Sequence, residues 1–233
     1  MKYFLPVLIA VMLTGCASTP GGNPQDPYEA YNRKAFKFNM ALDKAVMKPL
    51  AHGYDAALPK PAKTMIHNFF SNLDDVSITF NDLLQLKFRQ AMSDGYRVIF
   101  NTTFGLLGFI NITDRLPKHN EDFGQTLGYW GVGSGPYIML PFFGPSTVRD
   151  SVGLVGDGYT GVITNIRDVP VRNSLYAADK VEERAQLIPQ EPTLDEAPDR
   201  YAFVRDFYLA RRKNLVYDGH PPREKYIDDE DDD

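Results

Sequence analysis

Apolar residues recur at every third or fourth position along most of this chain, and this spacing constrains its fold more than any other feature. The first such series ends near Pro49 and consists of Tyr31, Ala35, Phe38, Leu42 and Val46. Residues with this spacing share one face of a helix. Outside the extreme N-terminus, no apolar run reaches the roughly 18 residues of a membrane-spanning helix. The sequence therefore predicts a mainly α-helical fold, and 233 residues suffice for a single domain.

Proline and polar residues divide the helical pattern into segments. Pro59 and Pro61 open a second amphipathic segment, and the polar residues 72–75 predict a break after it. Further helices are expected over residues 76–84, 88–99, 146–166, 170–188 and 198–217. The run from Phe104 to Ile110 is apolar on all sides, which suits either a core or a position in the lipid interface.

The N-terminus has the pattern of a signal peptide. A positive beginning precedes an apolar run over residues 3–13, and Leu13-Thr14-Gly15-Cys16 then places a small residue before a cysteine. The pattern resembles a bacterial lipoprotein signal, in which the cysteine is lipidated and becomes the first mature residue. The alternative is an ordinary secretory signal with an incidental cysteine. Ala17, rather than aspartate, follows the cysteine and indicates the periplasmic face of the outer membrane.

These features predict four parts: a signal peptide at 1–15, a lipidated tether at 16–27, a helical domain at 28–217 and a disordered acidic tail at 218–233. Cys16 is the only cysteine, so packing without a disulfide must stabilise the domain. The net charge of −5 comes largely from six acidic residues at 228–233. Without them and the signal, the body holds 24 basic and 24 acidic residues. A neutral body argues against a nucleic-acid binder.

Glycine is concentrated in one part of the chain. Ten of the 18 glycines lie between residues 124 and 161, together with Pro136, Pro141 and Pro145. This density predicts a Gly/Pro-rich loop block with turns and close packing rather than a plain helix. Residues 137–143 suit a short extended piece, and Gly153 and Gly156 suit a helix face that another element approaches closely.

A search for catalytic or metal-binding motifs finds none that holds. The four histidines are isolated in sequence and lack the spacing of a zinc helix. Ser134 lies among glycines, but Val132 stands where a nucleophile elbow requires glycine. Residues 156–161 match GxGxxG by letter, yet a helical pattern precedes them instead of a strand. The pairs Asp74/Asp75 and Asp150/Asp157 have no neighbours that favour acid–base chemistry. We therefore expect no enzyme, no cofactor and no metal site.

Several motifs follow one another in order between residues 26 and 190. The first is Asp26-Pro27-Tyr28-Glu29-Ala30-Tyr31-Asn32-Arg33 with Phe36-Lys37-Phe38-Asn39, and residues 71–74, 101–105 and 108–110 follow. The longest is Phe123-Gly124-Gln125-Thr126-Leu127-Gly128-Tyr129-Trp130-Gly131-Val132-Gly133, continued at 135–137, 140–141, 144–146 and 149–150. Together they resemble the MlaA (VacJ) lipoprotein family. Asn111 departs from the aspartate usual in that family.

The resemblance implies a ring of amphipathic helices in the inner leaflet of the outer membrane, with an amphipathic channel at its centre. It implies association with a trimeric porin and transfer of phospholipid from the outer leaflet to a periplasmic carrier of the Mla pathway. Such transfer maintains the lipid asymmetry of the outer membrane and involves no catalysis.

Our candidates for a channel or gate lie in two of these motifs and in the glycine-rich block. They are Asn32, Arg33, Phe38, Asn39, Gly133, Gly135, Tyr137 and Leu140. Maintenance of the fold is the alternative role for each of them. For the whole protein, the alternatives are a lipid-anchored scaffold that binds a porin or envelope partner without moving lipid, and an envelope hydrolase, which the absent catalytic motifs disfavour.

Overall fold

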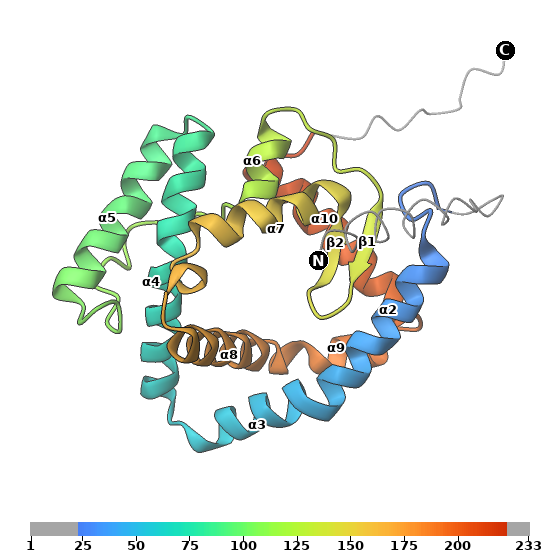
Figure 1. The fold of residues 1–233 in the computed structure, drawn as a ribbon, viewed down its shortest axis with the longest axis horizontal. Helices are drawn as coiled ribbons and strands as arrows, with labels where there is room; N and C mark the ends of the chain where they lie inside the picture. Colours follow the sequence, from blue (N-terminus) through green and yellow to red (C-terminus); the bar gives the residue numbers. More distant parts are fainter. Residues whose placement is uncertain (1–22, 223–233) are drawn as a thin grey trace, which may run out of the picture.

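Helices arranged in a ring form most of this protein (Figure 1). The computed structural model describes residues 23–222, so Cys16, the signal peptide and most of the predicted acidic tail lie outside the described residues. In Figure 1, α4 lies on one side of the ring, α7 and α10 above its centre, the β1–β2 hairpin and α2 opposite α4, and α3 and α8 below. The prediction of a mainly α-helical single domain is confirmed.

The first arc of the ring is a nearly continuous rod. It consists of α2 (Glu29–Leu42), a π-helical turn (Asp43–Met47) and α3 (Lys48–Ala57). The sequence predicts that this helix ends near Pro49, but the helical path continues past it. Proline lacks an N–H and its ring clashes with the carbonyl four residues back, and the wider π turn just before Pro49 accommodates both defects.

A helical hairpin forms the next part, made of α4 (Lys60–Leu84) and α5 (Phe88–Phe104). The predicted break at residues 72–75 is wrong, because α4 passes through them without interruption. Asn72 and Asp75 are buried against α5 instead. Asn72 donates a hydrogen bond to Thr102 Oγ1 over 2.9 Å, and Asp75 accepts one from Arg97 Nε over 3.0 Å. Polar residues here mark an inward helix face, not a helix end.

The glycine-rich block folds as helix, hairpin and helix, so it is more regular than a series of loops. It contains α6 (Phe123–Tyr129), the antiparallel strands β1 (Tyr137–Leu140) and β2 (Gly144–Thr147), and α7 (Val148–Thr160). In the hairpin, Tyr137 pairs with Thr147 and Leu140 with Gly144. The expectation of a closely approached face on α7 is confirmed. A Cβ on Gly153 would lie 2.5 Å from the backbone nitrogen of Gly124 on α6.

The C-terminal part adds three helices and two short 3₁₀ turns. The helices are α8 (Val169–Gln186), α9 (Glu191–Glu196) and α10 (Arg200–Val216), and the turns are Ile163–Asn165 and Ile188–Gln190. Side chains of Asp168 and Asp199 cap the N-termini of α8 and α10 by accepting backbone hydrogen bonds. Helix α10 contacts both α6 and β2, and so joins the block to the rest of the ring.

The segment before α2 is part of the fold. Asp26 is buried, and its carboxylate accepts hydrogen bonds from Asn32, Arg205 and Tyr201. The backbone carbonyl of Gln25 accepts a hydrogen bond from the N–H of Tyr137 over 2.8 Å. The end of the predicted tether therefore packs against β1 and α10, because a buried aspartate with three donors holds it there.

Burial in this fold is inverted relative to a water-soluble protein. Among the described residues, polar and charged side chains outnumber apolar ones in the fully buried set. A small apolar cluster forms around Ala35, Tyr137, Met139 and Tyr201. Large apolar side chains on α4, α5 and α7 are exposed instead. No helix within residues 23–222 has both the length and the hydropathy to cross a membrane.

Candidate functional site

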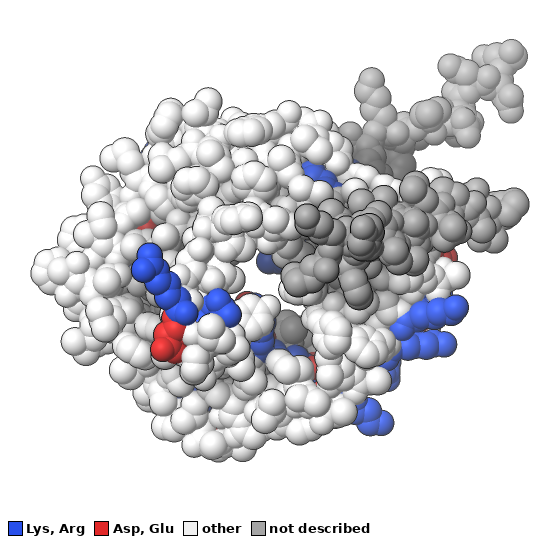
Figure 2. Space-filling view, in the orientation of Figure 1, with Lys and Arg blue, Asp and Glu red and all other residues white. Residues whose placement is uncertain are grey.

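A polar cavity of about 440 Å³ lies among α4, α6, α7, α8, α10 and the segment 118–122. Figure 2 shows that the molecule is hollowed near its centre, with lysine or arginine side chains visible in the hollow. The acidic residues of the cavity wall are Asp74, Glu121, Asp122, Asp157 and Glu183. The basic residues of the wall are Lys118, Arg211 and Arg212. The wall therefore presents both signs of charge to one shared space.

Three of these carboxylates, Asp74, Glu121 and Asp157, ionise less readily than usual, because burial raises the pKa of each. Asp157 is half-buried, and this burial raises its pKa to about 6, although its Oδ1 accepts a hydrogen bond from Phe123 N–H over 2.8 Å. Asp74 keeps contact with solvent in the cavity, but its enclosure by the wall also raises its pKa to about 6. The charge of the cavity wall therefore changes close to neutral pH.

Arg212 holds together the part of the cavity wall that α6, α7 and α10 form. Its guanidinium donates to both carboxylate oxygens of Asp122 and, over 2.9 Å, to Asp150 Oδ1. Burial would raise the pKa of Asp122, but the hydrogen bonds from Arg212 outweigh this effect and hold the pKa below its ordinary value. Asp122 also caps α6 by accepting from Gln125 N–H over 2.8 Å. One arginine thus joins α10, α6 and α7 around the cavity.

A second ionic network joins α4 to α5 and to the segment that follows α5. Asp75 is fully buried, and its two oxygens lie 3.0 Å from Arg97 Nε and 3.1 Å from Lys118 Nζ. Lys118 also donates to Ser71 Oγ over 2.7 Å. Two cationic side chains therefore surround one buried carboxylate, and one of them, Lys118, also lines the cavity wall.

The outside of the ring is apolar where α4, α5 and α7 face away from the cavity. Phe88, Phe104, Leu106 and Leu107 of the α5 region are all more than half exposed, as is Tyr159 of α7. The apolar run 104–110 therefore lies at the surface, which resolves the two alternatives left by the sequence. An apolar exterior of this kind is suited to contact with lipid.

A second cavity, of about 450 Å³, lies between the first arc and α8–α9. Arg184 crosses it with hydrogen bonds to Asp43 Oδ1 over 2.6 Å and to Glu191 Oε1 over 2.7 Å. Lys48 forms a further ion pair with Glu191 over 2.8 Å. These pairs connect α3 and the π turn to α8 and α9.

Five of the predicted channel residues meet at one seam between α2 and the hairpin. Asn32 contacts the backbone of Tyr137 and Met139, and Asn39 contacts the backbone of Leu140 and Phe142. Phe38 packs edge-on against Phe142, with ring centroids 5.1 Å apart. Tyr137 is fully buried in the apolar cluster. The five residues at this seam are Asn32, Phe38, Asn39, Tyr137 and Leu140.

The other three predicted residues lie elsewhere. Arg33 forms ion pairs with Glu29 and Asp199, each over 2.7 Å. Gly133 and Gly135 belong to the turn that leads into β1, and Gly135 has a φ of +65°. None of the eight predicted residues contributes to the wall of either cavity described above. Their role in a channel or gate stays a prediction.

The motifs rejected in the sequence have other positions in the fold. Residues 156–160 form the end of α7 and Gly161 follows as its C-cap, so a helix and not a strand precedes the GxGxxG letters. Three of the four histidines contact carboxylates: His52 contacts Glu191, His67 contacts Glu182 and His119 contacts Asp94. The fourth, His220, contacts the backbone oxygen of Asp218.

Sequence reasoning did not identify the residues of the cavity wall as a group. They come from six separate parts of the chain, between Asp74 and Leu215. A usable signal was present in α4, where Asn72, Asp75 and Asp82 recur with helical spacing and are all buried. On a helix that also has a continuous apolar face, a polar stripe of this kind marks the side that faces the interior when polar side chains are buried and apolar ones exposed.

Comparison with protein-family models shows a match to the MlaA lipoprotein family over residues 24–215. A relative from Escherichia coli (strain K12), the intermembrane phospholipid transport system lipoprotein MlaA, is 34% identical over 218 residues, covering 89% of this chain and 86% of its own. The protein of that name from Haemophilus influenzae is 31% identical over 223 residues, covering 91% and 89%.

The fold also matches a solved structure, described as "Structural basis for maintenance of bacterial outer membrane lipid asymmetry". The TM-score is 0.73 at 31% sequence identity, and the match covers 82% of this chain and 98% of that one. The same architecture therefore occurs in both proteins.

Proposed function

The chain belongs to the MlaA lipoprotein family, and from this premise we propose that the protein takes phospholipid from the outer leaflet of the outer membrane, moves it through the central cavity and releases it to a periplasmic carrier. This activity maintains the lipid asymmetry of the outer membrane. It is transport without covalent chemistry, and its relatives bear the names of transport lipoproteins.

The observation that carries this proposal is a charged cavity inside a ring with an apolar exterior. Moving a lipid between leaflets brings its charged headgroup through hydrocarbon, which is costly without polar partners or water. The ring offers polar partners inside while its outer apolar side chains contact lipid tails. A protein that only anchored a partner would not need such an interior.

The cavity wall suits a zwitterionic headgroup. Lys118 and Arg211 offer positive charge to a phosphate, and Asp74 and Glu183 offer negative charge to an ammonium group. Both signs line the same cavity, so one headgroup can contact both without complete dehydration.

The position in the envelope follows from the proposed lipid anchor. We place the ring in the inner leaflet of the outer membrane, on the periplasmic side, with acyl chains attached to Cys16. Stable anchoring requires about two acyl chains, which a multiply acylated cysteine supplies. Beside a trimeric porin, the ring would have a scaffold that spans the outer membrane, and its periplasmic side would meet the lipid carrier.

The test is to measure phospholipid in the outer leaflet of cells that carry only a variant protein. Arg211 is exposed in the cavity wall, and no described contact depends on it. We expect Arg211→Glu to increase phospholipid in the outer leaflet several-fold, toward the level of a deletion strain, at unchanged protein abundance. Arg115→Glu is the matched control, because Arg115 is exposed and lines neither cavity.

A lipid-anchored scaffold that moves no lipid is the alternative. If the deletion strain has the same outer-leaflet phospholipid as the wild type, while partner proteins lose their assembly, the scaffold is correct. If Arg211→Glu and Arg115→Glu both behave as wild type in a strain where deletion matters, the cavity is not the lipid path.

A further inference from the structure

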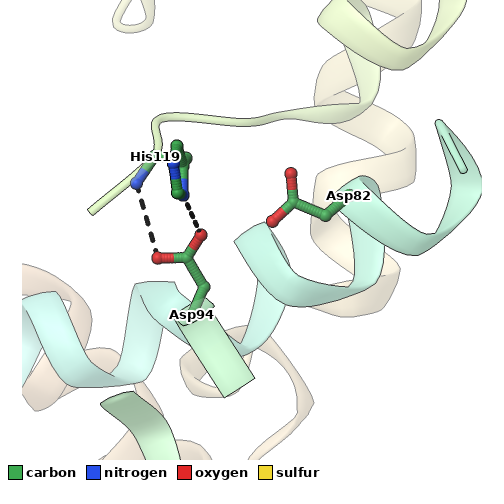
Figure 3. Close-up of side chains that lie close together, drawn as sticks. All are labelled: Asp82, Asp94 and His119. Atoms are coloured by element: carbon green, nitrogen blue, oxygen red, sulfur yellow. Dashed lines mark hydrogen bonds and ion pairs between the residues drawn. The ribbon is translucent and has the colours of Figure 1, made fainter. Parts of the chain in front are cut away.

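Asp82, Asp94 and His119 converge from three separate parts of the chain (Figure 3). Asp82 lies near the end of α4, Asp94 on α5 and His119 in the segment between α5 and α6. One ligand atom from each residue lies within 4.8 Å of the other two. Both aspartates are fully buried, and the His119 side chain is 24% exposed.

Asp82 stands out within this group because its charge has no partner. Among the residues that the structure describes, neither of its carboxylate oxygens has a hydrogen-bond partner, although both are buried. No lysine, arginine or histidine within residues 23–222 forms an ion pair with it. Figure 3 shows its carboxylate pointing into the space beside Asp94 and His119. A buried carboxylate without a partner is strongly unfavourable, so it requires either a cation or a proton.

The neighbouring cations are already engaged with other acids. Arg97 lies 3.0 Å from Asp75 but 3.9 Å from Asp94. Lys87 lies 2.8 Å from Glu121. Asp94 thus has His119 and the more distant Arg97 beside it, whereas Asp82 forms no ion pair with any residue within 23–222.

We propose that Asp82, Asp94 and His119 bind a divalent transition-metal cation, with Zn²⁺ as the best match. Two carboxylates and one neutral imidazole around a dication make an electrically neutral group, which suits a buried position. Ca²⁺ and Mg²⁺ prefer oxygen-only ligands, whereas an imidazole favours zinc and its neighbours. Three protein ligands leave the fourth tetrahedral position to a water.

The geometry needs only a small adjustment to accept the ion. Zinc bonds of about 2.0–2.2 Å place tetrahedral ligand atoms roughly 3.4 Å apart. His119 Nδ1 and Asp94 Oδ2 lie 2.6 Å apart, joined by a hydrogen bond. Binding would replace the proton between these two atoms and separate them by less than about 1 Å. The Asp82 oxygen lies within 4.8 Å of the other two ligand atoms, so it would approach them by at most about 1.4 Å.

Such an ion would fix the cavity wall. It would tie α4 and α5 to the segment that places Lys118, Glu121 and Asp122 in the wall. The site is thus structural, and its effect on stability is measurable without any assay of lipid transport. This inference does not depend on the proposed function.

The rival occupant is a proton shared between the two aspartates. Burial, together with the nearby negative charge of Asp94, raises the pKa of Asp82 to about 8, which would favour a protonated Asp82. A shared proton and a bound metal predict opposite results for zinc binding by the wild-type protein and for the stability of Asp82→Asn.

The experiment titrates ZnCl₂ into the mature lipidated protein in detergent, after removal of metals with a chelator, by isothermal calorimetry. We expect one saturable zinc per chain and a zinc-dependent rise in melting temperature that the chelator reverses. Asp82→Asn and His119→Ala should each weaken binding at least about tenfold. His52→Ala is the matched control. His52 also contacts a carboxylate, but among the described residues Glu191 is the one acidic residue that forms an ion pair with it.

Two results would overturn the proposal. The first is a wild-type protein that binds no zinc saturably, together with an Asp82→Asn variant at least as stable as wild type, which is the behaviour of a proton pair. The second is zinc binding that Asp82→Asn and His119→Ala leave unchanged. Displacement of the zinc by equimolar Ca²⁺ would overturn the assignment to a transition metal. If Asp82→Asn does not fold, the wild-type titration, its metal content and Asp94→Asn decide the question.

Discussion

Within residues 23–222 no third strand pairs with the β1–β2 hairpin, and asparagine side chains of α2 take the place of one. Asn32 Oδ1 accepts a hydrogen bond from Met139 N–H over 2.8 Å, and its Nδ2 donates to the carbonyl of Tyr137 over 3.2 Å and to Asp26 Oδ1 over 2.7 Å. Asn32 is fully buried, so water cannot replace these bonds. We predict that Asn32→Ala destabilises the fold and frees the hairpin.

The expected loss in the free energy of unfolding follows from the polar groups that Asn32→Ala leaves without a partner. Asn32→Ala leaves the N–H of Met139 and the carbonyl of Tyr137 buried and unsatisfied, and each such group costs about 1–3 kcal/mol. We therefore expect a loss of about 2–6 kcal/mol in the free energy of unfolding. For a domain of this size, that corresponds to a melting temperature lower by roughly 4–24 °C. Asn39→Ala should cost less, because Asn39 is only half-buried and the N–H of Phe142 is exposed.

The assay combines thermal unfolding in detergent with hydrogen exchange of the peptide that contains residues 137–147. We expect Asn32→Ala to speed exchange in that peptide more than in α4 or α8. Asn68→Ala is the matched control, since Asn68 donates one hydrogen bond to the carbonyl of Phe109, far from the hairpin in sequence. Equal melting temperatures and equal hairpin exchange for Asn32→Ala and Asn68→Ala would refute the reasoning.

Three further predictions address other parts of the chain. Cys16→Ala should abolish incorporation of labelled palmitate and release the protein from the outer-membrane fraction; continued labelling would disprove the proposed anchor. Gly135→Ala should cost about 1–2 kcal/mol because its φ is +65° and a new Cβ would lie 3.1 Å from Val148, whereas Gly133→Ala, with no atom within 4 Å of a new Cβ, should change the melting temperature little. The folded pKa of Asp157, about 6, lies above its ordinary 3.8, so the folded state holds this proton longer and stability falls as pH rises from about 4 to 6. Asp157→Asn should reduce the change in unfolding free energy over this pH range by about 1–3 kcal/mol. An unchanged profile of melting temperature against pH would contradict the role given to Asp157.

The sequence predicted the helices well because their signal is local. Periodic apolar residues and capping residues such as Asp199 determine where a helix forms, and both are visible in a short window. The errors occurred where a tertiary contact changed the meaning of a local signal. Asn72 and Asp75 resembled a polar break, but their partners on α5 make them part of a buried face. Pro49 resembled a helix end, but a π turn allows the helix to continue.

The cavity could not be predicted in the same way, because it is a product of long-range pairing. Arg212 meets Asp122 across 90 residues and Asp150 across 62. Nothing in the local pattern around Arg212 distinguishes it from Arg211, which is exposed and forms no such pair with any residue that the structure describes. Family motifs located the seam between α2 and the hairpin instead, since residues such as Asn32 and Asn39 are needed for the fold itself.

The inverted burial of this protein explains why its ionic networks are extensive. In water, apolar side chains are driven inward, and the core supplies most of the stability. In a lipid leaflet, which is the position we propose for the ring, the apolar exterior of α4, α5 and α7 would already face an apolar solvent, so little would be gained by burying it. The interior then has to be stabilised by pairing its polar groups. Arg212 with two aspartates, and Asp75 with two cations, therefore serve in place of an apolar core. Replacing an arginine or an aspartate of these networks should therefore lower the free energy of unfolding by more than truncating any exposed apolar residue on the outside of α4, α5 or α7.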